Sequence, residues 1–190
     1  MKILVTPTSF QDGNDNLALK KLQKYSNDIV FNETGRPLTE LELMDYLKDC
    51  DGFIAGLDNI TKQVIESTKK LKVISRYGAG VDRIDLKAAN SKGIVVTNTP
   101  GANSQAVAEL VIGLMFAFSR NLINLNNSTK RGEWVRNNGL QLEKKILGIV
   151  GFGSIGRKLA KMAMGIGMNV ISYDPFISKD VFKETNVEMV

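Results

Sequence analysis

The chain has 190 residues, of which 43% are hydrophobic and 24% charged, with no histidine and one cysteine. This composition is typical of a globular protein with one large or two small domains, and a lone cysteine excludes a disulfide framework or a cysteine metal site. The net charge of +5 is spread too thinly for a nucleic-acid surface, in which basic residues cluster with aromatic ones. No segment reads as a signal peptide or a membrane span, so we expect a cytoplasmic protein without a metal, membrane or nucleic-acid partner.

Residues 1–100 alternate short β-like runs with amphipathic runs. The predicted strands cover residues 3–6, 28–31, 52–56, 73–76 and 94–98, and the predicted helices cover 16–25, 41–48, 61–69 and 85–91. The second helix follows Pro37 and carries the capping-box pair Thr39 and Glu42. Strands that alternate with helices favour a parallel α/β sheet with helices on both faces.

A long apolar stretch follows the Pro100-Gly101 pair that ends the fifth predicted strand. It covers residues 106–118 and continues to about residue 127, which is long and apolar for a surface helix. We expect it to bridge two domains or to lie in a subunit interface; the alternative is a core helix. Residues 130–144 are predicted to form a polar loop that contains Trp134, the only tryptophan.

The last part of the chain reads as a dinucleotide-binding unit. An apolar strand at 146–150 enters a G-x-G-x-x-G turn made by Gly151, Gly153 and Gly156, and a helix is predicted at 154–165. In such a turn the first glycine permits the tight bend, the second lets the backbone approach a pyrophosphate, and the third lets the helix pack close to the strand. The helix N-terminus then offers N–H groups and partial positive charge to the phosphates.

A second strand, at 169–173, ends in Asp174. An acid at this place accepts hydrogen bonds from a ribose 2′-hydroxyl and repels a 2′-phosphate, so the sequence predicts NAD rather than NADP. The alternative is a strand–helix turn that binds no ligand. Residues 186–190 read as the opening of a further strand, and we therefore expect only the first part of such a domain here.

A second candidate anion site follows the fourth predicted strand. Gly78 and Gly80 flank Ala79, and this arrangement exposes backbone N–H groups that can form an anion nest. Arg76, just before it, adds a full positive charge suited to a carboxylate or a phosphate. The alternative is a plain turn at the end of a strand, with a solvated arginine.

Four segments, 76–85, 97–110, 132–134 and 148–157, together resemble the D-2-hydroxyacid dehydrogenase family, and within it the phosphoglycerate-specific members. The resemblance covers essentially the whole chain. It implies a flavodoxin-like substrate domain at 1–100, a bridging helix and loop at 101–144 that contributes to a homodimer, and a partial Rossmann-like NAD-binding domain at 145–190.

The resemblance also implies roles for individual residues. The loop amides hold the carboxylate of a 2-hydroxy or 2-oxo acid, the arginine before them meets the phosphate in phosphoglycerate-specific members, and the glycine turn and the acid hold NAD. The implied substrate-binding residues are Arg76, Gly78, Ala79 and Gly80, and the implied cofactor-binding residues are Gly151, Gly153, Ser154, Ile155, Gly156 and Asp174.

The family's catalytic arginine, glutamate and histidine have no counterpart here, and the sequence has no histidine, the usual proton-transfer residue near neutral pH. We therefore assign no catalytic residue. We expect a fragment, inactive alone, of an NAD-dependent oxidoreductase that acts on the CH–OH group of a D-2-hydroxy acid, with 3-phosphoglycerate of serine biosynthesis as the substrate. The alternative is a non-catalytic NAD-binding or interaction module.

Overall fold

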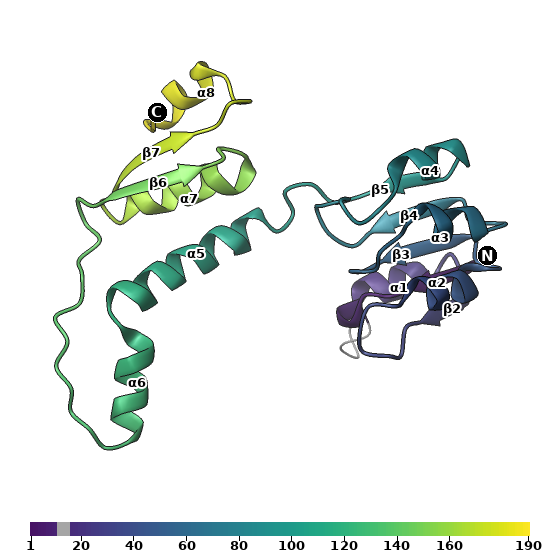
Figure 1. The fold of residues 1–190 in the computed structure, drawn as a ribbon, viewed down its shortest axis with the longest axis horizontal. Helices are drawn as coiled ribbons and strands as arrows, with labels where there is room; N and C mark the ends of the chain where they lie inside the picture. Colours follow the sequence, from purple (N-terminus) through teal and green to yellow (C-terminus); the bar gives the residue numbers. More distant parts are fainter. Residues whose placement is uncertain (11–15) are drawn as a thin grey trace. The chain divides into compact units, whose positions relative to one another are not determined.

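The computed structural model describes residues 1–10 and 16–190 (Figure 1). Contacts divide the chain into two compact units, Met1–Ala102 and Asn103–Val190, and each is described by itself. The predicted division into 1–100, 101–144 and 145–190 stays a prediction; in the structure, residues 103–144 group with the second unit.

The first unit is a five-stranded parallel sheet in the order β2-β1-β3-β4-β5. The strands are β1 (Lys2–Val5), β2 (Asp28–Phe31), β3 (Gly52–Ala55), β4 (Val73–Arg76) and β5 (Val95–Thr97). The connecting elements are a 3-10 turn η1 (Thr8–Phe10) and helices α1 (Leu17–Gln23), α2 (Glu40–Leu47), α3 (Lys62–Ser67) and α4 (Leu86–Ser91). This strand order is that of flavodoxin-like folds, so the predicted fold class is confirmed.

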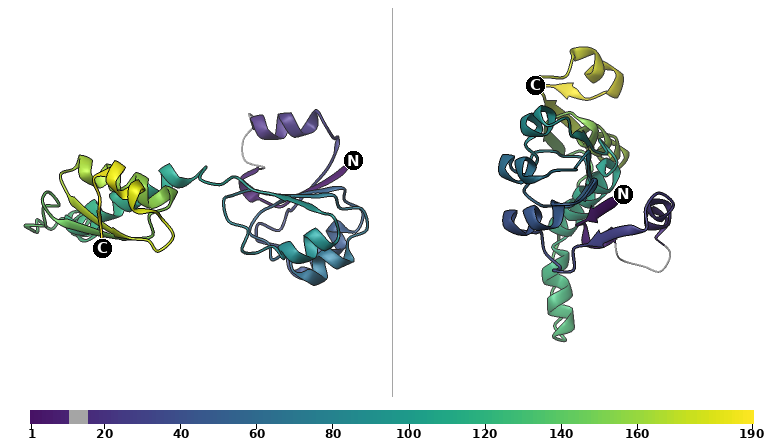
Figure 2. Two further views of the ribbon diagram at one scale, coloured as in Figure 1. Left: turned by 90° about the horizontal axis from the view of Figure 1, so that it is seen from above. Right: turned by 90° about the vertical axis from the view of Figure 1, so that its right-hand side faces the viewer.

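Apolar side chains cover both faces of this sheet. Along β1, Leu4 contributes to one buried cluster, while Ile3 and Val5 contribute to another, as the two-residue period of a strand requires. Figure 2 shows α1, in purple, on one side of the sheet and the helices that follow on the other. The predicted capping box is also confirmed, because the N–H of Glu42 donates to the Thr39 hydroxyl and the N–H of Thr39 donates to the Glu42 carboxylate.

The second unit is a three-stranded parallel sheet in the order β6-β7-β8 (Figure 1). The strands are β6 (Ile146–Val150), β7 (Asn169–Tyr173) and β8 (Glu188–Met189), and the helices are α5 (Ser104–Ser119), α6 (Leu122–Lys130), α7 (Ser154–Gly165) and α8 (Lys179–Thr185). Side chains from α5, α7, α8 and the strands form one buried cluster, which includes Ala108, Ile149, Leu159 and Phe182. The predicted strand–turn–helix–strand unit is confirmed.

Two features of the second unit differ from the prediction. The apolar helix expected to continue to about residue 127 is broken at Asn121, whose φ of 52° is left-handed, and α5 and α6 meet there at a bend of 61°. Asparagine tolerates this conformation better than most residues because its short polar side chain bonds locally. Helix α8 was not predicted at all.

Within the described part of the chain, no single helix is long and apolar enough to cross a bilayer, and only the bent α5–α6 pair, taken together, meets those criteria of length and composition.

Candidate functional site

The glycine turn between β6 and α7 has the geometry that its sequence requires. Gly151 has a φ of +95°, which side chains rarely adopt. A β-carbon at Gly156 would overlap the carbonyl oxygen of Gly151 and approach Cγ2 of Ile149 to 3.3 Å. A β-carbon at Gly151 or Gly153 would meet no described atom within 4 Å, so this side of the turn is open to a ligand. The cofactor roles of these glycines stay predictions, but the residues present fit a dinucleotide.

The N-terminus of α7 presents main-chain amides beside this open side. The first bond of the helical ladder runs from the N–H of Arg157 to the carbonyl of Gly153 at 3.0 Å. The N–H groups of Ser154 and Ile155 precede that bond, and such amides are ready donors to an anion. Their assignment to the pyrophosphate stays a prediction.

Asp174 lies directly after β7 and contacts the turn itself. Its Oδ2 accepts from the N–H of Phe152 at 2.7 Å, and its Oδ1 accepts from the N–H of Phe176 at 2.9 Å. These two main-chain hydrogen bonds, that of Phe176 first, hold the pKa of the Asp174 carboxyl below its usual value. The group is therefore ionised at neutral pH, as a ribose-binding acid must be, and it also fixes the turn, which the sequence did not reveal.

The second candidate site, at residues 76–80, follows β4. The N–H of Gly78 donates to the carbonyl of Arg76 at 2.9 Å, the N–H of Thr99 donates to the carbonyl of Gly78 at 3.0 Å, and Nδ2 of Asn98 donates to the carbonyl of Ala79 at 2.6 Å. Hydrogen bonds from Asn98 and Thr99 therefore join this loop to the residues that follow β5. The predicted role of Gly78 as a donor to substrate requires its internal bond to open.

The side chain of Arg76 lies across this loop. Its Nη1 donates to the carbonyl of Tyr77, and a β-carbon at Gly78, where φ is +147°, would come within 2.9 Å of that same nitrogen. Glycine at 78 therefore makes room for the guanidinium. A β-carbon at Gly80 would likewise come within 2.7 Å of Oδ1 of Asp82. The substrate roles of these residues stay predictions.

A cavity of about 290 Å³ lies beside Arg76. It opens at the carboxyl ends of β1, β3 and β4, and the step from β1 to β3 is the switch point at which doubly wound sheets bind ligands. Its lining residues include Thr6, Thr8, Ser9, Arg36, Gly56, Leu57, Asp58, Arg76 and Tyr77. Of these polar groups, the sequence pointed only to Arg76.

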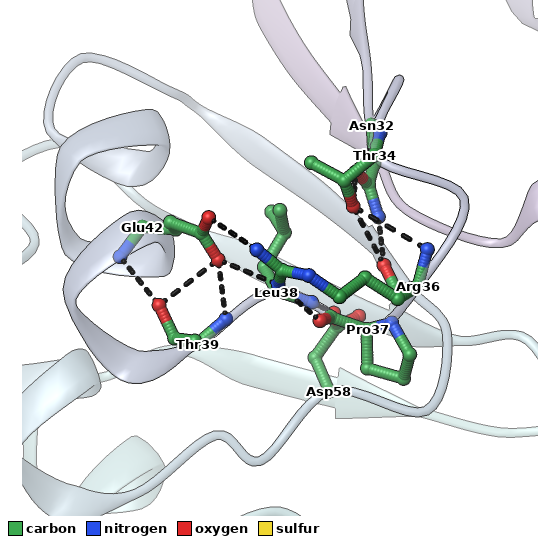
Figure 3. A network of polar contacts seen from close by, with 8 residues as sticks. All are labelled: Asn32, Thr34, Arg36, Pro37, Leu38, Thr39, Glu42 and Asp58. Atoms are coloured by element: carbon green, nitrogen blue, oxygen red, sulfur yellow. Dashed lines mark hydrogen bonds and ion pairs between the residues drawn. The ribbon is translucent and has the colours of Figure 1, made fainter.

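The cavity wall is held by a polar network (Figure 3). Asp58 is 1% exposed and accepts from the N–H of Leu38 at 2.8 Å and from the hydroxyl of Thr6, whose oxygen accepts in turn from the N–H of Gly56 at 2.8 Å. Asp58 therefore joins the segments that follow β1, β2 and β3. Because an aspartate just after a strand is ordinarily solvated, its burial could not be inferred from the sequence.

Arg36 and Glu42 form a bidentate pair in the same network, at 2.8 and 2.9 Å. The bonds from Arg36, with those from Thr39, lower the pKa of Glu42 to about 2. Much of the charge of Arg36 is thus neutralised by its partner, and Arg76 is the cation in this cavity without such an ion pair among the described residues. Across residues 1–10 and 16–190, no group of three or more His, Cys, Asp or Glu side chains could hold a metal ion.

The chain is similar to known proteins along most of its length. A family model described as D-isomer specific 2-hydroxyacid dehydrogenase, catalytic domain, matches residues 9–188. The D-3-phosphoglycerate dehydrogenase of Methanocaldococcus jannaschii is 44% identical over 193 residues, which cover 100% of this chain and 35% of the relative. The hydroxypyruvate reductase of Thermotoga maritima is 40% identical over 165 residues, which cover 85% of this chain and 54% of the relative. The chain thus spans between a third and about half of the length of these relatives.

Solved structures also resemble this chain over its whole length. The TT0316 protein of Thermus thermophilus has a TM-score of 0.86 at 31% identity, with 100% of this chain and 60% of that chain covered. The 3-phosphoglycerate dehydrogenase of Entamoeba histolytica, solved with NAD⁺ bound, has a TM-score of 0.74 at 34% identity, with 100% and 57% covered. An acyclic imino acid reductase solved with NADPH and D-Arg has a TM-score of 0.82 at 26% identity, with 100% and 60% covered.

Proposed function

The chain belongs to the D-isomer-specific 2-hydroxyacid dehydrogenase family, and from that premise we propose that it provides the substrate-anion loop and the first part of the cofactor site of an NAD-dependent oxidoreductase. The complete enzyme acts on the CH–OH group of a D-2-hydroxy acid, and 3-phosphoglycerate, on the route to serine, is the proposed substrate. The identity of 44% to a D-3-phosphoglycerate dehydrogenase supports this substrate. The proposed location is the cytoplasm.

The observation that carries the proposal is the turn between β6 and α7 together with Asp174. The turn is open at Gly151 and Gly153, closed by helix packing at Gly156, and followed by α7 amides that can bind a pyrophosphate. The Asp174 carboxylate accepts a ribose 2′-hydroxyl but repels a 2′-phosphate, which makes NAD the cofactor. The residues of this turn would hold NAD, which would supply the hydride acceptor for C2 of the substrate.

The contribution of this chain to the reaction is binding and orientation. The amides of Ala79 and Gly80 and the guanidinium of Arg76 hold the anionic groups of the substrate. The chain has no imidazole to take the hydroxyl proton, so the proposal assigns that step to a group outside these 190 residues.

The absence of histidine also favours a second candidate function, a non-catalytic NAD-binding module. Both candidate functions include NAD binding. Only the first predicts substrate turnover when the catalytic groups that lie outside this chain are present. For the 190-residue chain alone we expect NAD binding without turnover, because a general acid–base group contributes about 10²–10⁴-fold and the chain has no imidazole to serve as one.

The test is to measure NAD and NADP binding by calorimetry and NADH formation with 3-phosphoglycerate, using a mass-verified sample of the 190-residue chain. We expect weak binding that favours NAD, and no steady-state NADH formation. Equal affinity for the two dinucleotides would overturn the cofactor assignment, and sustained NADH formation would overturn the assignment of proton transfer to another segment.

We also propose that α5, α6 and the loop after them form a homodimer surface. Large apolar side chains are exposed there, including Phe118 at 89% and Trp134 at 87%, and such a patch is typical of an association site. Light scattering should give a dimer for the unmutated chain and a monomer for Phe118→Glu. The matched control is Leu41→Glu, at a side chain 79% exposed on α2, and it should stay dimeric. A monomeric unmutated chain would contradict the proposal.

A further inference from the structure

The residue between the first two glycines of the turn, Phe152, is held at both of its main-chain polar atoms. Its N–H donates to Oδ2 of Asp174 at 2.7 Å, and its carbonyl oxygen accepts from Nη1 of Arg157 at 3.0 Å. Asp174 follows β7 and Arg157 lies in α7, so the two side chains reach the turn from different elements. Two groups of opposite charge thus hold the same residue.

The side chain of Phe152 supplies a third point of attachment. It is fully buried, and its ring stacks on that of Phe182 in α8, with 4.6 Å between centroids and 14° between planes. Gly151 and Gly153, on either side, have no side chain that could fix the backbone, and glycine loses more conformational freedom on ordering than any other residue. Besides the bond from the N–H of Gly151 to the carbonyl of Tyr173 at 2.8 Å, the order of the turn therefore depends on what holds Phe152.

Arg157 is placed to hold two consecutive carbonyl groups. Its guanidinium donates to the carbonyl of Phe152, and its own N–H donates to the carbonyl of Gly153. The amides of Ser154 and Ile155 follow directly, so a shift of these carbonyls would move the groups proposed to bind the pyrophosphate. A turn that is already ordered loses less entropy when its ligand binds.

We propose that Arg157 is a positioning residue for the dinucleotide-binding turn, and that Asp174 has the same role in addition to recognising the ribose. This inference rests on the proposed NAD site. The side chain of Arg157 acts through the carbonyl of Phe152 rather than through contact with a phosphate, whereas its main-chain bond to Gly153 is an ordinary helix bond that Arg157→Met retains. The carboxylate of Asp174 thus has two roles in the proposed NAD site. It orders the turn that binds the pyrophosphate, and it accepts a hydrogen bond from the ribose.

The competing explanation is that Arg157 contributes only positive charge. Lys158, the next residue in α7, is also exposed and offers the same charge, and it provides a matched control. Arg157→Met should weaken NAD binding by about tenfold, the usual loss for a hydrogen bond made by a charged group, and Lys158→Met by less than about twofold. Arg157→Lys, which keeps a donor, should recover part of the loss. Adenosine, which has no pyrophosphate, should bind equally to all three variants and the unmutated chain.

Amide hydrogen exchange gives a second measure that needs no ligand. In Arg157→Met, exchange at residues 151–154 should accelerate severalfold while β7 keeps its protection, and Lys158→Met should leave both unchanged. Equal effects of the two methionine variants, or unchanged exchange at the turn in Arg157→Met, would overturn the inference. If the unmutated chain does not bind NAD, the proposed function fails, and the exchange measurement still decides whether Arg157 orders the turn.

Discussion

The two parallel sheets of the molecule are covered differently. In the first unit, Leu4 and Val5 of β1 are both 0% exposed, because apolar clusters lie on the two faces of the sheet. In the second unit, Ile149 of β6 is 7% exposed but Val150 is 90% exposed, because the cluster made with α5, α7 and α8 covers one face. The first unit is thus stabilised by a core on both sides, whereas the geometry of the dinucleotide turn depends on a few specific contacts.

Gly156→Ala should have the largest effect on the stability of the second unit relative to the first. The added β-carbon would overlap the carbonyl of Gly151, and the rigid backbone cannot yield as a side chain does. We expect a loss of about 3 kcal/mol, at the upper end of overpacking costs, confined to the second unit. Denaturant unfolding, with hydrogen exchange to resolve the units, measures it.

The control for this change is Gly148→Ala in β6, where a β-carbon would meet no described atom within 4 Å. It should leave the stability of both units nearly unchanged. Equal destabilisation by the two substitutions would show that packing at Gly156 is not what holds the turn. Faster exchange in β1 and β3 of the Gly156→Ala variant would show that the units do not unfold separately.

The corresponding test in the first unit is Asp58→Ala. It leaves the N–H of Leu38 buried without its acceptor and leaves the Thr6 hydroxyl only the more distant carbonyl of Ile54, at 3.5 Å. A buried donor without its acceptor costs about 1–3 kcal/mol. We expect a loss of about 2–3 kcal/mol, with NAD affinity unchanged. Asp45→Ala, at an exposed acid on α2, is the control and should be near neutral. If Asp58→Ala were equally mild, the buried network would not be what joins the strand ends.

The sequence predicted the parts of this fold whose signals are local. The alternation of strands and helices, the capping box at Thr39 and the turn from Gly151 to Gly156 each depend on residues close together in the chain, and the structure contains all three. Helix α8 was not predicted, although it is as long as α1, and the break at Asn121 was missed because neither glycine nor proline marks it.

The contacts that hold the candidate site were harder to predict, because they join residues distant in the chain. The hydrogen bond from Phe152 to Asp174 spans 22 residues, and the one from Thr6 to Asp58 spans 52. Both acids stand just after a strand, where a solvated side chain is the ordinary expectation. The chemical type of each acid could be read from the sequence, but its burial and its partners depended on the tertiary fold.

A smaller effect is expected from Asp174→Ala, which tests the cofactor turn of the second unit through its affinity for NAD and NADP. The substitution removes the ribose acceptor and the acceptor for the N–H of Phe152, so NAD binding should fall by about tenfold. NADP binding should fall less, since a repelling charge is removed along with the support of the turn, and the preference for NAD should shrink. Calorimetry with both dinucleotides measures this; an unchanged ratio of the two affinities would contradict it.

Acid should act on the same contact. The pKa of Asp174 is below its unfolded value because the N–H groups of Phe176 and Phe152 bond to the carboxylate. A depressed pKa means that the contribution to stability is fully present above the unfolded value and is lost as the pH falls through the folded one. Protection of the Phe152 amide should therefore persist through neutral and mildly acidic pH and disappear below about pH 4, the ordinary range of an aspartate. Loss of that protection near pH 6 would contradict the assignment.

The smallest effect is expected at the start of α2, in the well-covered first unit. Thr39→Ala removes the acceptor for the N–H of Glu42 and should cost about 1 kcal/mol, the usual value of an N-cap residue, whereas Thr39→Ser should be nearly neutral because serine caps equally well.

Acid should weaken the same cap, since the bonds from Arg36 and Thr39 lower the pKa of Glu42 to about 2. The contribution of Glu42 is present above its unfolded value and is lost as the pH falls toward 2, so the difference between the two variants should narrow over that interval. Urea unfolding at several pH values measures it, and a difference that stays constant into acid would show that Glu42 takes no part in capping α2.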